Sequence, residues 1–168
     1  MLIKFFGSCA IIGASLLCGR KISSGLRLRK DSLAAFHSAL VMLESEINFS
    51  QNSIDNAFEN ISKSIPLSGF FGCVSENTAR LGIRKAWNSA LEEYKSRLGL
   101  TGSDAEILLS FSAELGITDR ENQIKNIRYI LSLLGAAEKE AQEKYNTLSG
   151  LYRSICTGAG LTAAILLL

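Results

Sequence analysis

Proline, histidine and catalytic signatures are scarce in this chain of 168 residues. Pro66 is its only proline and His37 its only histidine. Proline costs a helix interior about 3 kcal/mol or more, so a chain almost without it permits long helices. A lone histidine beside Phe36 is typical of a structural or surface position rather than a catalytic one. No run alternates apolar and polar residues between turn residues, so the sequence argues against β-strands.

Enzyme signatures are absent as well. The sequence has no G-x-S-x-G, no P-loop and no Gly-rich dinucleotide fingerprint. Its four cysteines, Cys9, Cys18, Cys73 and Cys156, form no C-x-x-C pair and no metal-ligand spacing with histidine. We therefore expect no enzyme, no catalytic residue, no cofactor, no metal site and no small-molecule substrate.

Charged residues are missing from two terminal segments, 5–19 and 154–168. Each segment would extend roughly 22 Å as a helix, somewhat less than the roughly 30 Å hydrocarbon core of a bilayer. We interpret 1–19 and 154–168 as transmembrane helices. A cleaved signal peptide or lipoprotein signal is the alternative for the first segment, but the cleavage region lacks the small residues that processing needs. A buried core helix is the other alternative.

Basic residues crowd the chain just after the first hydrophobic segment: Arg20, Lys21, Arg27, Arg29 and Lys30. By the positive-inside rule, region 20–153 faces the cytoplasm. The basic run is an ordinary stop-transfer flank or a contact for anionic lipid headgroups. All acidic residues fall within 31–152, where they outnumber the basic ones. Such a region is a poor nucleic-acid binder and a better partner for a basic protein.

The middle region has helical periodicity throughout. Apolar residues spaced by three and four predict a helix over 26–49, continuous with the first hydrophobic segment; its stripe is Leu33, Phe36, Leu40, Leu43 and Ile47. Shorter helices are predicted between 53 and 116, one of them ending at Pro66. The stretch "GFFGCVSENTARLG" is expected to form a short helix or two. Ser103 and Glu106 are expected to form a capping box that opens another helix.

The stretch "LGITDRENQIKNIRYILSLL" predicts the start of a long helix. Thr118 and Glu121 have capping-box spacing, and Asp119 adds negative charge at the helix N-terminus. A heptad seam follows at Ile124, Ile127, Leu131, Leu134, Glu138, Ala141, Tyr145, Leu148 and Tyr152. Its expected partner is the 33–47 stripe. The predicted fold is all-α: a helical bundle, 20–153, with long antiparallel stalk helices continuing into two terminal transmembrane helices.

Four segments in order resemble the stage III sporulation protein AB family of endospore-forming bacteria. They are "ALVMLESEINFSQNSIDNAFENI", "AWNSALEE", "LLSFSAELGITDRENQIKNIRYILSLL" and "YRSICTGAGLTAAILLL". The resemblance implies a membrane protein of the mother cell, around the forespore, that serves a secretion-like channel. It also implies similarity to the platform proteins of type II secretion and type IV pilus systems. The expected partners are the stage III sporulation protein AA ATPase and other stage III channel proteins.

Two functions from different classes follow. The first is an assembly platform whose membrane helices anchor a bundle that docks the cytoplasmic secretion-type ATPase. The second is a membrane-tethered helical adaptor or signalling module without a channel role. The residues expected at the partner-binding surface are Glu44, Glu46, Asp119, Arg120 and Gln123. Helix capping by Asp119 and simple solvation of Glu44 and Glu46 are the alternatives to partner contact.

Overall fold

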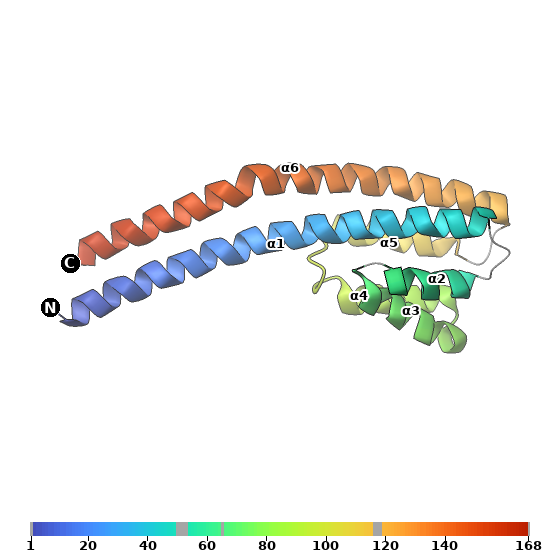
Figure 1. The fold of residues 1–168 in the computed structure, drawn as a ribbon, viewed down its shortest axis with the longest axis horizontal. Coiled ribbons are helices and arrows are strands. Elements are labelled where there is room, and N and C mark those ends of the chain that lie inside the picture. The colour runs from blue at the N-terminus through green and yellow to red at the C-terminus, as the bar shows by residue number, and fades with distance from the viewer. Residues whose placement is uncertain (1, 50–53, 65, 116–118, 168) are drawn as a thin grey trace. The chain divides into compact units, whose positions relative to one another are not determined.

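The computed structural model describes residues 2–49, 54–64, 66–115 and 119–167, and these contain six α-helices and no strand (Figure 1). The helices are α1 (Leu2–Phe49), α2 (Ile54–Ser64), α3 (Ser68–Leu81), α4 (Ile83–Tyr94), α5 (Gly102–Ala113) and α6 (Arg120–Leu167). The all-α prediction is confirmed. The long first helix is also confirmed, because the 26–49 segment and the hydrophobic segment before it form the single helix α1.

The chain divides into two compact units. The first unit contains Met1–Lys30 and Glu140–Leu168, and the second contains Asp31–Lys139. Helices α1 and α6 each contribute residues to both units, whereas α2 to α5 belong wholly to the second. The domain limits predicted at residues 19 and 153 concern a membrane boundary and stay a prediction.

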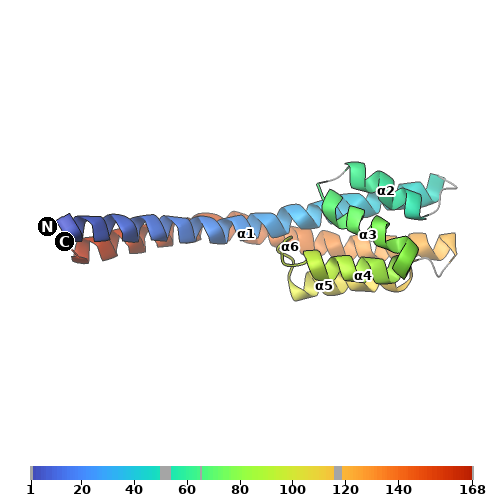
Figure 2. The same ribbon diagram turned by 90° about the horizontal axis from the view of Figure 1, so that it is seen from below.

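In the second unit, α1 contributes the apolar stripe predicted for it. Leu33, Phe36, Leu40 and Leu43 are fully buried, and Ile47 is 9% exposed. Phe36 on this part of α1 contacts Phe70 and Phe71 of α3 and Trp87 of α4, and α2 packs against α3, α3 against α4 and α4 against α5 (Figures 1 and 2). The stripe recurs every three or four residues because the helix has 3.6 residues per turn, so it remains on one buried face.

A cluster of aromatic rings fills the centre of the second unit. The Trp87 ring lies edge-on to Phe111 and Phe70, with centroid distances of 4.9 Å and 5.0 Å. Phe36 and Phe58 also contact the indole. Edge-to-face aromatic pairs contribute about 0.5–1.5 kcal/mol beyond area burial. The buried indole N–H donates to the Leu108 carbonyl at 2.8 Å, so the polar edge of Trp87 is satisfied.

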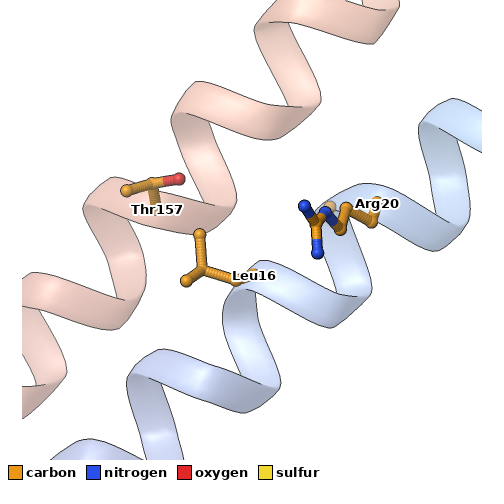
Figure 3. Close-up of a pocket in the computed structure, with 4 residues that line it drawn as sticks. Leu16, Arg20 and Thr157 are labelled. Carbon is orange, nitrogen blue, oxygen red and sulfur yellow. The ribbon is translucent and has the colours of Figure 1, made fainter.

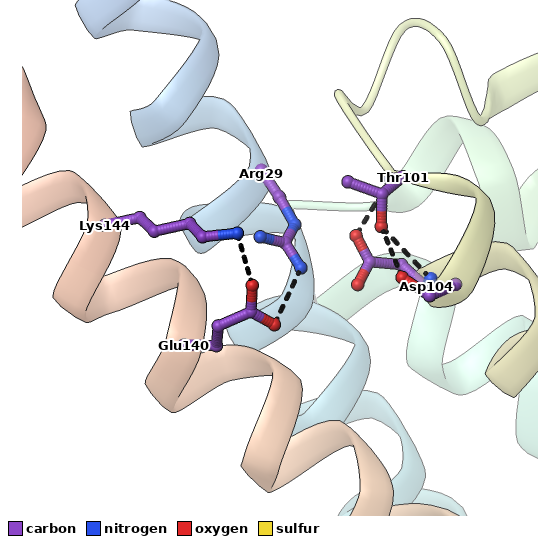
Figure 4. A network of polar contacts seen from close by, with 6 residues as sticks. Arg29, Thr101, Asp104, Glu140 and Lys144 are labelled. Atoms are coloured by element: carbon purple, nitrogen blue, oxygen red, sulfur yellow. Dashed lines mark hydrogen bonds and ion pairs between the residues drawn. The ribbon is translucent and has the colours of Figure 1, made fainter.

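The bounds of α3 and α4 and the capping box of α5 can be compared with the predictions for these helices. The stretch expected as one or two short helices is the single helix α3, and Gly82 separates it from α4 with φ of 78°. A side chain is strained at that φ, which favours glycine. The capping box of α5 was misplaced by two residues: Thr101 Oγ1 accepts from the Asp104 N–H, and the Asp104 carboxylate accepts from the Thr101 N–H (Figure 4).

The buried seam of α6 is partly as predicted. Ile127, Leu134 and Ala141 are buried as expected, but the intervening seam positions are Ile130 and Ala137. Leu131 and Glu138, which were predicted there, are half-buried. The seam therefore lies one residue earlier at these two steps, and its polar position at Glu138 was wrong. A seam through Ile130 and Ala137 and a seam through Leu131 and Glu138 both have steps of three and four residues. Packing against the other helices decides which of the two is buried.

In the first unit, α1 and α6 form an antiparallel pair (Figure 1). Ser23 Oγ donates to the Ser149 carbonyl at 3.1 Å, and a guanidinium nitrogen of Arg29 lies 3.6 Å from Glu140 Oε2. Lys30 Nζ lies 5.2 Å from the centroid of the Tyr145 ring. Polar contacts thus join α1 and α6 in this unit, and Tyr145, a residue of the predicted seam, takes part in one of them.

The two expected transmembrane helices do not gain support from the structure. In the part of the chain that it describes, no helix is both long enough and apolar enough to cross a membrane. The assignment of 1–19 and 154–168 as transmembrane helices stays a prediction from the sequence.

The aromatic cluster yields a prediction about stability. Trp87→Ala should lower the free energy of unfolding by about 3–5 kcal/mol, because it leaves a cavity among packed rings. Trp87→Phe should cost about 1–3 kcal/mol, because it removes the hydrogen bond to Leu108 and some packing. Tyr129→Ala is the control, because the Tyr129 side chain is 60% exposed. Urea unfolding followed by circular dichroism measures all three, and equal losses in the three variants would contradict this account of the core.

Candidate interaction surface

The five residues predicted for partner binding come from two helices of the second unit. Glu44 and Glu46 lie near the C-terminal end of α1. Asp119 immediately precedes α6, and Arg120 and Gln123 belong to its first turn. Each has to be judged by its contacts within the chain, because a side chain already used in the fold is a weak candidate for a partner contact.

Asp119 is the N-cap of α6. Its Oδ1 accepts from the Asn122 N–H at 2.9 Å, and its carbonyl accepts from the Gln123 N–H at 3.0 Å. Thr118, the predicted cap, lies outside the described residues. An N-cap carboxylate satisfies a helix donor that would otherwise lack a partner and also favours the positive end of the helix dipole. The geometry therefore supports helix capping, rather than partner contact, as the role of Asp119.

Glu44 forms an ion pair with Arg128. Arg128 Nε donates to Glu44 Oε1 at 2.6 Å and so joins α1 to α6. The Glu44 side chain is 20% exposed, whereas that of Arg128 is 65% exposed. The carboxylate is thus mostly covered and already has a cationic partner within the fold. A pair of this kind with one exposed member contributes at most about 1 kcal/mol.

The other three predicted residues do not form one surface with Glu44 and Asp119. Glu46 is half-buried and Arg120 is exposed. Gln123 is half-buried and lines a very small apolar space, about 10 Å³, together with Ile47 and Ile127. The predicted set therefore contains one helix cap, one interhelical ion pair and one residue at the edge of the core.

The structure brings together a different surface that the sequence reasoning missed. A shallow groove of about 450 Å³ is lined by Glu114, Asn122, Lys125, Asn126 and Tyr129. We call these five residues the α5–α6 groove. Glu114 follows α5 and the other four lie on α6, so residues 115–121 separate the two parts in sequence.

Tyr129 is the signal that could have revealed this groove. It lies two residues after the buried Ile127, and the helical period turns it away from the buried seam. Exposed aromatic residues are enriched at binding hot spots, because a tyrosine supplies a large apolar ring and a hydroxyl together. At the inner side of the groove, Asn126 Nδ2 donates to the Phe111 carbonyl at 3.4 Å, which helps to hold α6 against α5.

The titratable groups show where reactivity is low. Burial raises the pKa of the Cys73 thiol, and the nearby Glu93 carboxylate adds to the effect. A thiol with a raised pKa is protonated at neutral pH and is a weak nucleophile. Among the described residues, no group of three or more histidine, cysteine, aspartate or glutamate side chains is arranged to hold a metal ion.

A second polar cluster lies in the first unit. Glu140 contacts both Lys144 and Arg29 (Figure 4). The hydrogen bond from Lys144 and the charge of Arg29 lower the pKa of the Glu140 carboxyl from its ordinary value. Arg29 is only 8% exposed, so Glu140 supplies the anion that such a buried guanidinium needs. This cluster pairs its charges internally and serves the contact between α1 and α6.

Comparisons with known proteins agree with one another. The family model described as "Stage III sporulation protein AB (spore_III_AB)" matches residues 4–168. Stage III sporulation protein AB of Bacillus subtilis (strain 168) is 28% identical over 171 residues, which cover 99% of this chain and all of that protein. A solved structure of stage III sporulation protein AB (SpoIIIAB) is similar with a TM-score of 0.64 at 30% identity. The similarity covers 70% of this chain and 96% of the solved chain.

The capping role of Asp119 can be tested by separating its hydrogen bond from its charge. Asp119→Ala should lower the free energy of unfolding by about 0.5–2 kcal/mol, whereas Asp119→Asn should retain most of the stability, because asparagine is an equally good N-cap. Arg120→Ala is the neighbouring control and should change stability by less than about 0.5 kcal/mol. Thermal and urea unfolding give these values. An Asp119→Ala variant as stable as the parent would contradict the capping role.

Proposed function

Because this chain belongs to the stage III sporulation protein AB family, we propose that it is a non-enzymatic, membrane-anchored assembly component of a secretion-like channel between mother cell and forespore. Its family makes it a stage III sporulation protein. In the proposal, the second unit docks a cytoplasmic secretion-type ATPase. The family resemblance implies that this ATPase is the stage III sporulation protein AA. The bundle acts as an adaptor that positions the ATPase against other stage III proteins.

The observation that carries the docking proposal is the exposed Tyr129 in the α5–α6 groove. Its side chain is 60% exposed, whereas Phe36, Phe58, Phe70, Phe71, Trp87 and Phe111 of this unit are buried. Glu114, Lys125 and two asparagines surround it, so an apolar ring lies within a polar rim. Protein interfaces commonly have such an arrangement of an aromatic anchor and polar surroundings.

The charge of the chain supports a basic partner surface. All 16 acidic residues lie between residues 31 and 152 and outnumber the basic residues there. The excess negative charge favours association with a basic patch and disfavours nucleic acid. Within the groove, however, Lys125 forms an ion pair with Glu121 at 2.9 Å. We therefore expect the general acidity of the unit to affect the rate of association more than the affinity.

Membrane anchoring is proposed from the sequence alone. The segments 5–19 and 154–168 contain no charged residue, and a basic run follows the first of them. A second, finer part of the proposal is the location: the mother-cell membrane around the forespore, with region 20–153 facing the cytoplasm.

The docking proposal predicts an effect of Tyr129→Ala. Binding of the full chain to the companion ATPase should weaken by about tenfold or more, because truncating a tyrosine hot spot costs more than about 1.4 kcal/mol of binding free energy. The matched control is Val41→Ala, which removes a side chain that is 46% exposed on α1. Calorimetry or surface plasmon resonance measures both affinities, and circular dichroism checks that both variants fold.

Three outcomes distinguish docking through the α5–α6 groove, ATPase docking in general, and the adaptor function. Unchanged binding in Tyr129→Ala would remove the α5–α6 groove as the docking surface. No binding between the parent chain and the ATPase would remove the docking function itself. If deletion of the gene leaves channel function intact but abolishes a developmental signal, the membrane-tethered adaptor is the better description.

The membrane proposal predicts a protease pattern. In intact cells the region 20–153 should be protected from added protease, and in inverted membrane vesicles it should be digested, because the basic flank is retained on the cytoplasmic side. Alkaline carbonate should leave the full chain in the membrane pellet. Recovery of the chain in the supernatant would contradict membrane anchoring, and digestion in intact cells would contradict the orientation.

A further inference from the structure

One side of α1 in the first unit is basic and polar; Arg20, Ser24 and Arg27 are exposed there, and Ser23 is half-buried. Arg20, Ser23, Ser24 and Arg27 have the spacing i, i+3, i+4 and i+7, which places residues on one side of a helix. Together with Tyr145 and Ser149 of α6 they line a cavity of about 310 Å³. That volume is at the lower limit for small-ligand pockets. The cavity lies at the solvent-exposed margin of the helix pair, because Arg20, Ser24 and Arg27 are exposed.

The donors that line this cavity suit an anion. The hydroxyl protons of Ser23 and Ser24 are used within the chain, since the single proton of Ser23 is shared between the carbonyls of Gly19 and Ser149 and Ser24 donates to that of Lys21. The guanidinium groups of Arg20 and Arg27 are therefore the main donors. A guanidinium has five N–H groups in a planar fork that matches phosphate, so one contact to a neighbour leaves further donors.

Negative charge is missing from the lining. None of the described residues that line the cavity is acidic, and Arg20 forms no ion pair with a described residue. The contrast within the unit is Arg29, which is buried and paired with Glu140. Lys30 adds positive charge near the cavity, because its ammonium group lies 5.2 Å from the centroid of the Tyr145 ring.

A second cavity adjoins the first at Arg20. It is lined by Leu16, Gly19, Arg20 and Thr157 and also measures about 310 Å³ (Figure 3). Leu16 and Arg20 come from α1 and Thr157 comes from α6. Leu16 and Leu17 are 46% and 66% exposed, and both belong to the charge-free segment. Arg20 thus lines both cavities, and Leu16 places an apolar side chain beside its guanidinium. A cation next to an apolar side chain suits an amphipathic anion.

We propose that the first unit binds one anionic phospholipid, with its headgroup phosphate held by Arg20 and Arg27 beside Tyr145 and the start of its acyl chains against Leu16. The choice of a lipid over a free phosphate rests on the proposed membrane anchoring and on the exposed leucines next to Arg20. Basic pockets between membrane helices are known to recognise such headgroups. The lipid contributes the negative charge that the lining of the cavity lacks.

The test uses the full chain in a mild, uncharged detergent. Native mass spectrometry measures binding of phosphatidylglycerol, with phosphatidylcholine and glycerol phosphate as comparison ligands. R20Q/R27Q should bind phosphatidylglycerol about tenfold or more weakly than the parent, because two guanidinium–phosphate contacts are lost. The matched control is R84Q/K85Q, which removes two exposed basic residues from α4 of the second unit and should bind like the parent.

Several results would overturn the proposal. They are equal phosphatidylglycerol binding by the parent and R20Q/R27Q, an equal loss in R84Q/K85Q, and binding of phosphatidylcholine as tight as that of phosphatidylglycerol. Glycerol phosphate bound as tightly as the lipid would make this a soluble-phosphate site instead. If R20Q/R27Q does not fold, R20K/R27K decides: it retains the charge but not the planar fork, so it should bind several-fold more weakly, and parental affinity would refute the site.

Failure of this site and failure of membrane anchoring give different results. Without membrane anchoring, both the parent chain and R20Q/R27Q are recovered in the supernatant after carbonate extraction. Without the lipid site, both remain in the membrane pellet and bind phosphatidylglycerol equally in detergent.

Discussion

Burial of the apolar stripe on α1 is the constraint on which the second unit depends. Leu33, Phe36, Leu40 and Leu43 are fully removed from solvent, and each buried side chain of this kind contributes about 1.5–3 kcal/mol. Helices α2 to α5 have only 11 to 14 residues, and isolated helices of that length are marginal in water. Their stability therefore comes from covering this stripe and each other, with Trp87 among them.

The described contacts between α1 and α6 differ in their balance of apolar and polar groups between the two units. In the second unit α1 and α6 are held by apolar burial, with the Glu44–Arg128 ion pair at the margin. In the first unit the described contacts include polar ones, from the Ser23 hydrogen bond to the Arg29–Glu140 ion pair, beside the buried Ala141. Packed apolar side chains leave no room for a ligand, whereas the exposed side chains of Arg20 and Arg27 line a cavity that suits a charged one. The proposed protein-docking and lipid-binding surfaces therefore belong to different units.

Local patterns predicted much of the fold. The stripe of α1 was predictable because helical periodicity is written in consecutive residues, and α6 was predictable as one long helix for the same reason. Errors occurred where two sets of nearby residues have the same spacing and fit the same local pattern. Thr101 and Asp104 cap α5, although Ser103 and Glu106 have the same spacing. Ile130 occupies the seam of α6 in place of Leu131, because neighbouring apolar residues compete for the same buried position.

The candidate site was much less predictable. Charge and position made Glu44 and Asp119 plausible partner contacts, but an ion pair and a helix cap occupy them within the chain. The α5–α6 groove was missed because Glu114 and Tyr129 are brought together only when α5 and α6 pack. A polar side chain has the same local sequence signature whether it binds its own fold or a partner.

The sequence by itself determined an all-α chain, the order of its helices, its apolar stripes and its family. Local periodicity gives the first three, and four segments that match the family in the same order along the chain give the last. Only the tertiary structure decided which polar side chains form contacts within the chain and which line cavities. Arg29 and Arg20 illustrate the difference: both belong to one basic run, yet one is buried against Glu140 and the other lines two cavities. That outcome depends on distances between α1 and α6, and residues so far apart in the chain leave no local pattern that reports such distances.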